Sequence, residues 1–285
     1  MKIIEEIKRN IPRRIKDPIY WLWTFLRKPQ LKYIEVHLTD HCNLNCSGCG
    51  HFSSIAPIKF TNLDKYKEDM KRLGQLFPRG IKKIRLMGGE PLLHPDAHLF
   101  IRATSAAFPK CDLHFCTNGM LLPRATAEFW EECRESKTII DFTIYPLVRK
   151  YLKKYLSLCN KQGVDYTLTE FSGTFLAHLN FAGDSEIKKT FRSCQNRFPC
   201  PFLQEGHIYH CTKPALIHYF NENFGHRIIA DKGINIHDTR ITGGKILRRL
   251  RRPIITCKWC TDFVPFKWSV SEGMAEEWEA DFHRK

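Results

Sequence analysis

Residues 39–49 read TDHCNLNCSGC and contain three closely spaced cysteines, Cys42, Cys46 and Cys49. Three and then two residues separate them. Such spacing in a chain without an export signal is more typical of metal or iron–sulfur ligands than of disulfide partners. Three thiolates from one loop can bind three irons of a 4Fe–4S cluster and leave the fourth iron open to another molecule. The alternatives are an incidental cysteine-rich turn and half of a zinc site.

A strand-like run precedes these cysteines, and the sequence GGEP at residues 88–91 ends a second such run. In this combination the chain resembles the radical S-adenosylmethionine (radical SAM) superfamily, over roughly residues 33–170. The resemblance implies a catalytic 4Fe–4S cluster whose open iron chelates S-adenosylmethionine. One electron from such a cluster cleaves this cofactor to methionine and a 5′-deoxyadenosyl radical.

The resemblance also indicates which residues contact the methionine part of the cofactor. They are the four residues at the end of the second strand, Gly88, Gly89, Glu90 and Pro91. Glu90 is expected to fix this segment. The two glycines would leave the backbone bare, so that a ligand can approach it closely.

Other cofactor contacts are expected from loops that also follow predicted strands. Thr117 and Asn118 are candidates for contacts with the ribose or the carboxylate. Gly48 stands where the family usually carries an aromatic residue that packs on the adenine, so Phe52 or His51 is expected to replace it. The carboxyl ends of parallel strands build the site in such folds, which places all these loops at one edge of the sheet.

Strand-like and helical segments alternate from residue 33 onward. Strands are predicted at residues 33–38, 82–87, 113–116, 138–144 and 164–169. Helices are predicted at residues 61–77, 95–107, 123–134 and 148–156, the first of them capped by Thr61. This alternation predicts an α/β fold with a parallel sheet covered by helices. The resemblance makes it a partial (β/α)6 barrel, whose sixth strand would be irregular or lie within residues 171–193.

A second group of cysteines follows residue 190. Cys194 is followed by eleven residues, Gly206, four residues and Cys211, and later by Cys257 and Cys260, which are two residues apart. Four thiolates complete the shell of a 4Fe–4S cluster or of a structural zinc ion. The spacing resembles the small cysteine-rich auxiliary-cluster domain called twitch, a relative of the SPASM domain, and this implies a second 4Fe–4S cluster. Residues 204–211 fit a small hairpin there, and Cys200 is a rival to Cys194.

Charge and composition divide the chain further. The formal net charge is +15, from 45 basic and 30 acidic side chains, which favours an anionic partner. Residues 1–32 form a basic, aromatic appendage before the core at residues 33–190 and the auxiliary-cluster domain at residues 191–285. The appendage could contact a membrane surface or another protein, or pack on the core. With no secretory signal and no run of roughly 20 apolar residues, a cytoplasmic location is expected.

These observations predict a radical SAM enzyme that abstracts hydrogen from a small, sugar-like, anionic substrate, including phosphorylated and nucleotide-linked forms. Oxidation of an alcohol is the first expectation and makes the chain an oxidoreductase, with a flavodoxin- or ferredoxin-type protein as reductant. Epimerisation is the second. In that case Cys116 or Cys200 would act catalytically, by donating a hydrogen atom to the substrate radical.

Two other functions stay open at this point. One is a radical SAM maturase of a ribosomal peptide, which would bind a leader peptide. The other is a zinc-stabilised, basic protein that binds nucleic acid. The chain shows no recognisable nucleic-acid-binding fold, which makes a nucleic-acid partner the weaker expectation.

Overall fold

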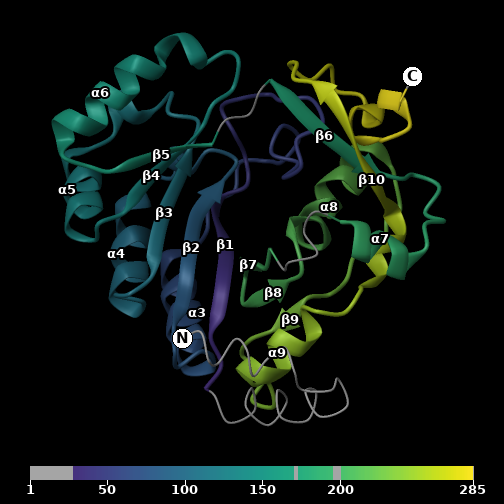
Figure 1. The fold of residues 1–285 in the computed structure, drawn as a ribbon, viewed down its shortest axis with the longest axis horizontal. Coiled ribbons are helices and arrows are strands. Elements are labelled where there is room, and N and C mark those ends of the chain that lie inside the picture. Colours follow the sequence, from purple (N-terminus) through teal and green to yellow (C-terminus); the bar gives the residue numbers. More distant parts are fainter. Residues whose placement is uncertain (1–27, 170–172, 195–199, 285) are drawn as a thin grey trace, which may run out of the picture.

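An eight-stranded sheet organises the computed structural model, which describes residues 28–169, 173–194 and 200–284 (Figure 1). The strand order is β5-β4-β3-β2-β1-β7-β8-β9, in which β1 to β5 and β7 are parallel and β8 and β9 are antiparallel to their neighbours. Its strands are β1 (Leu31–Thr39), β2 (Ile81–Gly88), β3 (Asp112–Thr117), β4 (Ile139–Thr143), β5 (Tyr166–Thr169), β7 (Phe202–Gln204), β8 (His207–Tyr209) and β9 (Ile234–Asn235). The predicted α/β fold is confirmed, and within the described residues the sheet stays open.

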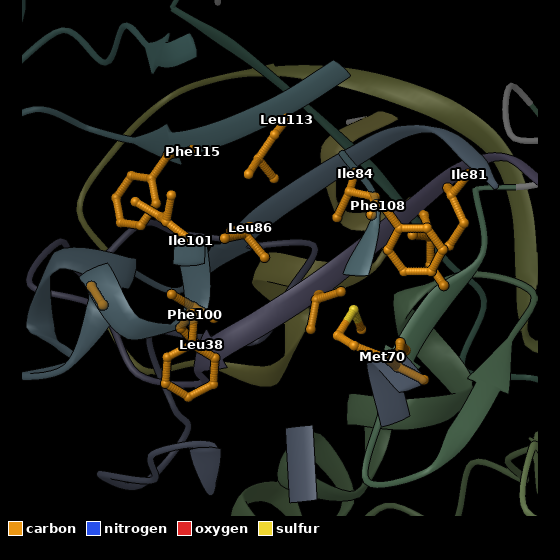
Figure 2. Close-up of a cluster of buried hydrophobic side chains, with 14 of the residues drawn as sticks. Leu38, Met70, Ile81, Ile84, Leu86, Phe100, Ile101, Phe108, Leu113 and Phe115 are labelled. Carbon is orange, nitrogen blue, oxygen red and sulfur yellow. The ribbon is translucent and has the colours of Figure 1, made fainter. Parts of the chain in front are cut away.

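Four helices cover one face of β1 to β5 (Figure 1). They are α3 (Leu63–Leu76), α4 (Ala97–Ala107), α5 (Ala127–Glu135) and α6 (Leu152–Gln162). Alternate strand residues point into this layer because successive side chains of a strand face opposite sides. Ile84 and Leu86 of β2 are fully buried there, together with Phe115 of β3 and Phe100 of α4 (Figure 2).

Most of the described chain after β5 lies beside the other side of the sheet (Figure 1). This part contains α7 (Ile187–Ser193), α8 (Thr212–Phe224) and an antiparallel pair of strands, β6 (Thr174–Leu179) and β10 (Cys260–Lys267). The helix α9 (Gly243–Arg249) instead packs beside α3, because its Ile246 is buried in the same apolar core. Single 3-10 turns are found at Pro91–Leu93, Leu122–Arg124, Arg149–Tyr151, Ile255–Trp259, Ala275–Trp278 and Phe282–Arg284. Among the described residues, no helix is long and apolar enough to cross a bilayer.

Two sequence-based expectations about these elements are wrong. A strand does lie within residues 171–193, but this strand, β6, pairs with β10 in a separate sheet, and β7 occupies the place beside β1. Thr61 does not cap α3, because its hydroxyl donates to the carbonyl of His37 at 2.7 Å. Asn62 is the cap instead, and its side chain accepts from the amide of Lys65.

The hairpin expected at residues 204–211 is confirmed as β7 and β8. Glu205 and Gly206 form its turn with φ values of 46° and 73°, the backbone that a tight two-residue hairpin requires. The predicted appendage at residues 1–32 lies almost wholly outside the described residues, which begin at residue 28.

The core offers a matched pair of substitutions. Ile84 is fully buried, whereas Ile58 is 77% exposed. Ile84→Ala should lower the free energy of unfolding by about 2–5 kcal/mol, because it removes buried methylene groups and leaves a cavity. Ile58→Ala should change it by less than about 0.5 kcal/mol. Urea denaturation measures both, and equal effects would contradict this placement of the core.

Candidate functional site

A cavity of about 470 Å³ lies over the face of the sheet that α3 to α6 leave uncovered. The floor of the cavity is formed by strand residues, because successive side chains of a strand point to opposite faces of the sheet. Ile84 and Leu86 enter the apolar core, whereas Arg85 and Met87 line the cavity. All seven cysteines predicted as ligands line this one cavity, namely Cys42, Cys46, Cys49, Cys194, Cys211, Cys257 and Cys260. The fold therefore brings together two groups of thiols that lie far apart in the sequence.

The first group of thiols follows β1. Burial, and then the neighbouring Cys49 thiol, raise the pKa of Cys46 to about 12. Burial also raises the pKa of Cys42, with further contributions from Glu90 and the other two cysteines. Three thiols this close together repel as thiolates, and bound iron would supply the positive charge that favours the ionised form. Their donor chemistry therefore fits a thiolate-held cluster.

The GGEP segment packs directly against the cysteine loop. The amide of Gly89 donates to the carbonyl of Thr39 at 2.9 Å, and the amide of Glu90 donates to the carbonyl of His41 at 3.1 Å. A Cβ atom on Gly88 would lie 2.2 Å from the Thr39 carbonyl oxygen, and one on Gly89 would lie 2.0 Å from that of His41. The protein's own backbone therefore requires these glycines. Both also line the cavity, and the expected approach of a ligand to them stays a prediction.

Glu90 links this segment to the end of β3. Its carboxylate accepts from the hydroxyl of Thr117 at 2.6 Å, from the amide of Asn118 at 2.9 Å and from the amide of Leu92 at 3.1 Å. Burial nevertheless outweighs these hydrogen bonds and raises the pKa of Glu90 to about 7. Pro91 then begins the 3-10 turn that follows.

Thr117 and Asn118 both line the cavity, with side chains that are already engaged. The hydroxyl of Thr117 accepts from the amide of Gly119 at 3.0 Å while it donates to Glu90. The side-chain amide of Asn118 donates to Asn43, next to the first cysteine, at 2.8 Å. Thr117 thus connects the end of β3 with the GGEP segment, and Asn118 connects it with the cysteine loop.

Phe52 does not occupy the place that was expected of it. Its side chain is fully buried and is not among the residues that line the cavity. The ring packs instead against Phe220 and Trp278, with centroid distances of 5.9 and 6.2 Å. His51, the alternative, does line the cavity, and its Nδ1 lies 2.8 Å from Nε2 of His37.

A C-terminal segment, residues 266–278, packs against the cysteine loop. No local pattern in the sequence indicates this contact. Cys46 and Val270 form an antiparallel bridge. The amide of Ser47 donates to the carbonyl of residue 269 at 3.0 Å, and the indole of Trp278 donates to the carbonyl of Cys49 at 2.8 Å. In Figure 1 the loop after β1 accordingly lies between the main sheet and the β6–β10 pair.

The same segment explains the glycine at position 48. A Cβ atom on Gly48 would lie 2.5 Å from the carbonyl oxygen of Glu277 and 2.8 Å from the ring of Phe266. Its φ of 59° also favours glycine. The space that an aromatic side chain would need is therefore filled by the C-terminal segment.

Trp268 gives a second indication that the first thiol group fits a cluster. Its indole N–H is buried and has no hydrogen-bond partner among the described residues. The same N–H lies near enough to the thiol of Cys46 to favour the charged form of that thiol and so lower its pKa. A cluster-bound thiolate is the kind of acceptor that this donor lacks.

The second group of thiols comes from the end of α7, the start of α8, the turn Ile255–Trp259 and the first residue of β10. Cys211 caps α8, and burial raises its pKa to about 12. Burial also raises the pKa of Cys260 to about 11, with smaller contributions from Cys257 and Cys194. Cys200 lies near Cys194 and Glu35 but does not line the cavity. Within the described residues, no three Cys, His, Asp or Glu side chains are arranged to hold a single metal ion.

A polar network across the cavity floor was missed in the sequence, although period-two alternation could have indicated it. Arg85 of β2 donates to Asp141 of β4 at 3.0 Å and to the thiol of Cys116 of β3 at 2.9 Å, and it lies 3.9 Å from Glu35 of β1. Burial raises the pKa of Asp141, but hydrogen bonding from His114 and the charge of Arg85 outweigh it and lower this pKa overall. Cys116, expected to face the site, does line the cavity.

Comparisons with known proteins concern mainly the region that carries the first group of thiols. Residues 36–167 match the model of the Radical SAM superfamily, so they form a radical SAM domain. The GTP 3′,8-cyclase of Sulfurovum sp. (strain NBC37-1) is 28% identical over 169 residues, which cover 58% of this chain and 52% of that protein. The GTP 3′,8-cyclase of Nautilia profundicola is 36% identical over 93 residues, 33% of this chain and 29% of that protein. The chain thus matches about half or less of the length of these curated relatives.

One solved structure has a similar fold over most of the chain. It is BtrN in complex with AdoMet and 2-DOIA, with a TM-score of 0.52 and 19% sequence identity. The match covers 81% of this chain and 93% of BtrN, and so extends beyond the radical SAM domain. At this identity the likeness concerns the fold alone.

The close contact at Gly89 can be tested directly. Gly89→Ala places a Cβ atom against the carbonyl of His41, so we expect a loss of about 1–3 kcal/mol of stability and less iron bound after anaerobic reconstitution. Gly74→Ala is the matched control, because no atom lies within 4 Å of its added Cβ. Iron assay and urea denaturation are the measurements. Unchanged iron in Gly89→Ala would show that the cysteine loop does not depend on this contact.

Glu90 predicts a pH dependence of stability. Its pKa is about 7 in the folded chain against an ordinary 4.5, so the folded chain keeps this proton where the unfolded chain has released it. The free energy of unfolding should therefore fall between about pH 4.5 and pH 7 and then level off. Glu90→Gln should remove that part of the slope, whereas Glu68→Gln, on the exposed side of α3, should keep it. An unchanged slope in Glu90→Gln would contradict the assignment.

Proposed function

We propose that this chain, whose residues 36–167 form a radical SAM domain, is an enzyme that abstracts a hydrogen atom from a carbohydrate-type substrate and oxidises an alcohol. The observation that supports this proposal is the shared cavity. Thiols of the radical SAM loop and thiols of the C-terminal region border the same space of about 470 Å³. A substrate in that space can meet both groups.

Each thiol group would hold one 4Fe–4S cluster. Cys42, Cys46 and Cys49 would hold the first, and Cys194, Cys211, Cys257 and Cys260 the second. When bound, the first cluster with S-adenosylmethionine supplies a 5′-deoxyadenosyl radical, and the second, with all its irons held by protein thiolates, supplies electron transfer. Because such a second cluster has no free iron for a substrate, it favours oxidation over epimerisation.

The chain's own residues would bind and orient the substrate and exclude water. Leu44, Phe175, Phe191 and Phe263 contribute apolar walls to the cavity. The floor presents Glu35 and Arg85, which are held by the network of side chains on neighbouring strands. A few fixed polar groups in a mostly apolar pocket are suited to orient a hydroxylated ligand. Burial raises the pKa of Glu35, so its carboxyl can share a proton with a substrate hydroxyl.

The names of the curated relatives favour a second candidate, a radical cyclisation of a purine nucleotide. The two GTP 3′,8-cyclases described above match this chain over 52% and 29% of their own length. Both candidates share a radical SAM domain and an anionic, sugar-containing substrate. They differ in whether the substrate loses electrons.

Product analysis separates the candidates. The reconstituted enzyme with reductant and S-adenosylmethionine should form 5′-deoxyadenosine above background only when a substrate is present. An oxidised product would be lighter than its substrate by two hydrogens, and a sugar phosphate series and GTP are the compounds to compare. Cys46→Ala should abolish 5′-deoxyadenosine, whereas Cys159→Ala, buried on α6 away from the cavity, should retain it. A product of unchanged mass would exclude oxidation and favour epimerisation or cyclisation.

A further inference from the structure

We propose that the basic surface around α9 docks the protein on an anionic lipid membrane. This surface consists of six exposed basic residues, namely Arg240, Lys245, Arg248, Arg249, Arg251 and Arg252. None of them lines the thiol-bordered cavity. The proposal is therefore independent of the chemistry proposed for that cavity.

Helical spacing gathers most of this charge on one side of α9. The basic residues recur at intervals of three, one and three along the helix and just past its end, namely Lys245, Arg248, Arg249 and Arg252. Residues at such intervals share one face of a helix. Ile246 and Leu250 are buried in the apolar core instead. The helix is thus attached by its apolar side and presents a cationic side to solvent.

The positive charge of this surface is largely uncompensated. An open pocket of about 610 Å³ has five of the six basic residues in its lining, together with the carboxylate of Asp238. Asp238 pairs with Arg240 at 3.0 Å. In the part of the chain that the structure describes, the other five basic side chains have no carboxylate within 4 Å. Such a field attracts an anionic partner.

The described chain begins beside the same surface. A Cβ atom on Gly243, the first residue of α9, would lie 2.8 Å from the ring of Pro29. Lys28 is exposed next to it. Residues 1–27 lie outside the described residues, but the covalent chain joins them to the fold at this point. Their sequence adds seven lysines and arginines against three acidic residues.

The sequence that joins here favours lipid over nucleic acid as the partner. Residues 19–26 read IYWLWTFL and are followed directly by Arg27 and Lys28. Tryptophan and tyrosine beside basic residues suit the interface between a bilayer and water. Ile255, which is 40% exposed, adds an apolar side chain three residues after Arg252. Reversible membrane binding becomes stable when apolar insertion and a polybasic patch act together, and both meet at this surface.

Sedimentation of the full-length chain with lipid vesicles tests the proposal. The wild type should bind vesicles of phosphatidylcholine mixed with phosphatidylserine more tightly than vesicles of phosphatidylcholine alone. Raising the salt from about 0.1 M to about 1 M should weaken this binding, because it shortens the reach of exposed charges from about 10 Å to about 3 Å. Equal binding to both kinds of vesicle, or no binding to either, would overturn the proposal.

A triple variant assigns the binding to α9. Each basic group near an anionic membrane contributes roughly fivefold to partitioning, so Arg248→Gln, Arg249→Gln and Arg252→Gln together should weaken it by about 100-fold. The matched control combines Lys150→Gln, Lys153→Gln and Lys154→Gln, which are exposed at α6, far from α9 in Figure 1. The control should bind as the wild type does. Equal losses in the two triple variants would show that net charge alone is responsible and would overturn the proposal.

Two further measurements separate the contributions. Trp21→Ala with Trp23→Ala should weaken vesicle binding but keep its salt dependence, whereas the arginine variant should lose most of that dependence. Undiminished binding by the arginine variant would assign the membrane contact to residues 1–27 alone and overturn the role of α9. Arginine-dependent binding of a DNA or RNA oligonucleotide, without binding to the phosphatidylserine vesicles, would overturn the proposal in favour of nucleic acid.

Discussion

The backbone of the cysteine loop and that of the GGEP segment lie so close together that a side chain does not fit between them. The carbonyl oxygens of Thr39 and His41 occupy the positions that Cβ atoms of Gly88 and Gly89 would need. This contact forms where β1 and β2 end side by side, in a parallel register that runs from Leu31 and Ile81 onward. The sheet itself therefore sets where the three thiols stand. Glu90 extends the arrangement to β3, because it accepts hydrogen bonds from both the strand end and the following turn.

The C-terminal region holds the same loop from the opposite side. The bridge between Cys46 and Val270, and the hydrogen bond from Trp278 to Cys49, tie the radical SAM loop to the region that carries the second group of thiols. Gly48 is the residue that permits this approach. The cavity lies between the two regions, so its shape depends on both. This dependence links the packing of a segment more than 200 residues downstream to the chemistry of the first three cysteines.

Local patterns in the sequence were enough for β1 to β5 and for the helices that cover them. The helices each bury one apolar face, and the strands are short runs rich in apolar and β-branched residues. They were also enough for the hairpin of β7 and β8, since Glu205 and Gly206 form its turn. Local sequence patterns did not predict which strands pair when the strands lie far apart in the chain. The pairing of β6 with β10 and the place of β7 beside β1 leave no periodic signal.

Side-chain environments were harder to predict than the elements that carry them. Phe52 was expected in the site but belongs to an apolar cluster with Phe220 and Trp278, partners that only the fold brings near. The cysteine spacings did point to the cavity, and so did the loops after β2 and β3, since Gly88 and Thr117 also line it.

The central claim is that the two thiol groups hold separate clusters on one cavity, and iron and sulfide counts test it most directly. The variant to measure combines Cys42→Ala, Cys46→Ala and Cys49→Ala, after anaerobic reconstitution. About four irons per chain should remain, held by Cys194, Cys211, Cys257 and Cys260. No remaining iron would contradict the claim. The C-terminal cysteines would then be structural or zinc-binding, and the oxidation would lack its electron acceptor.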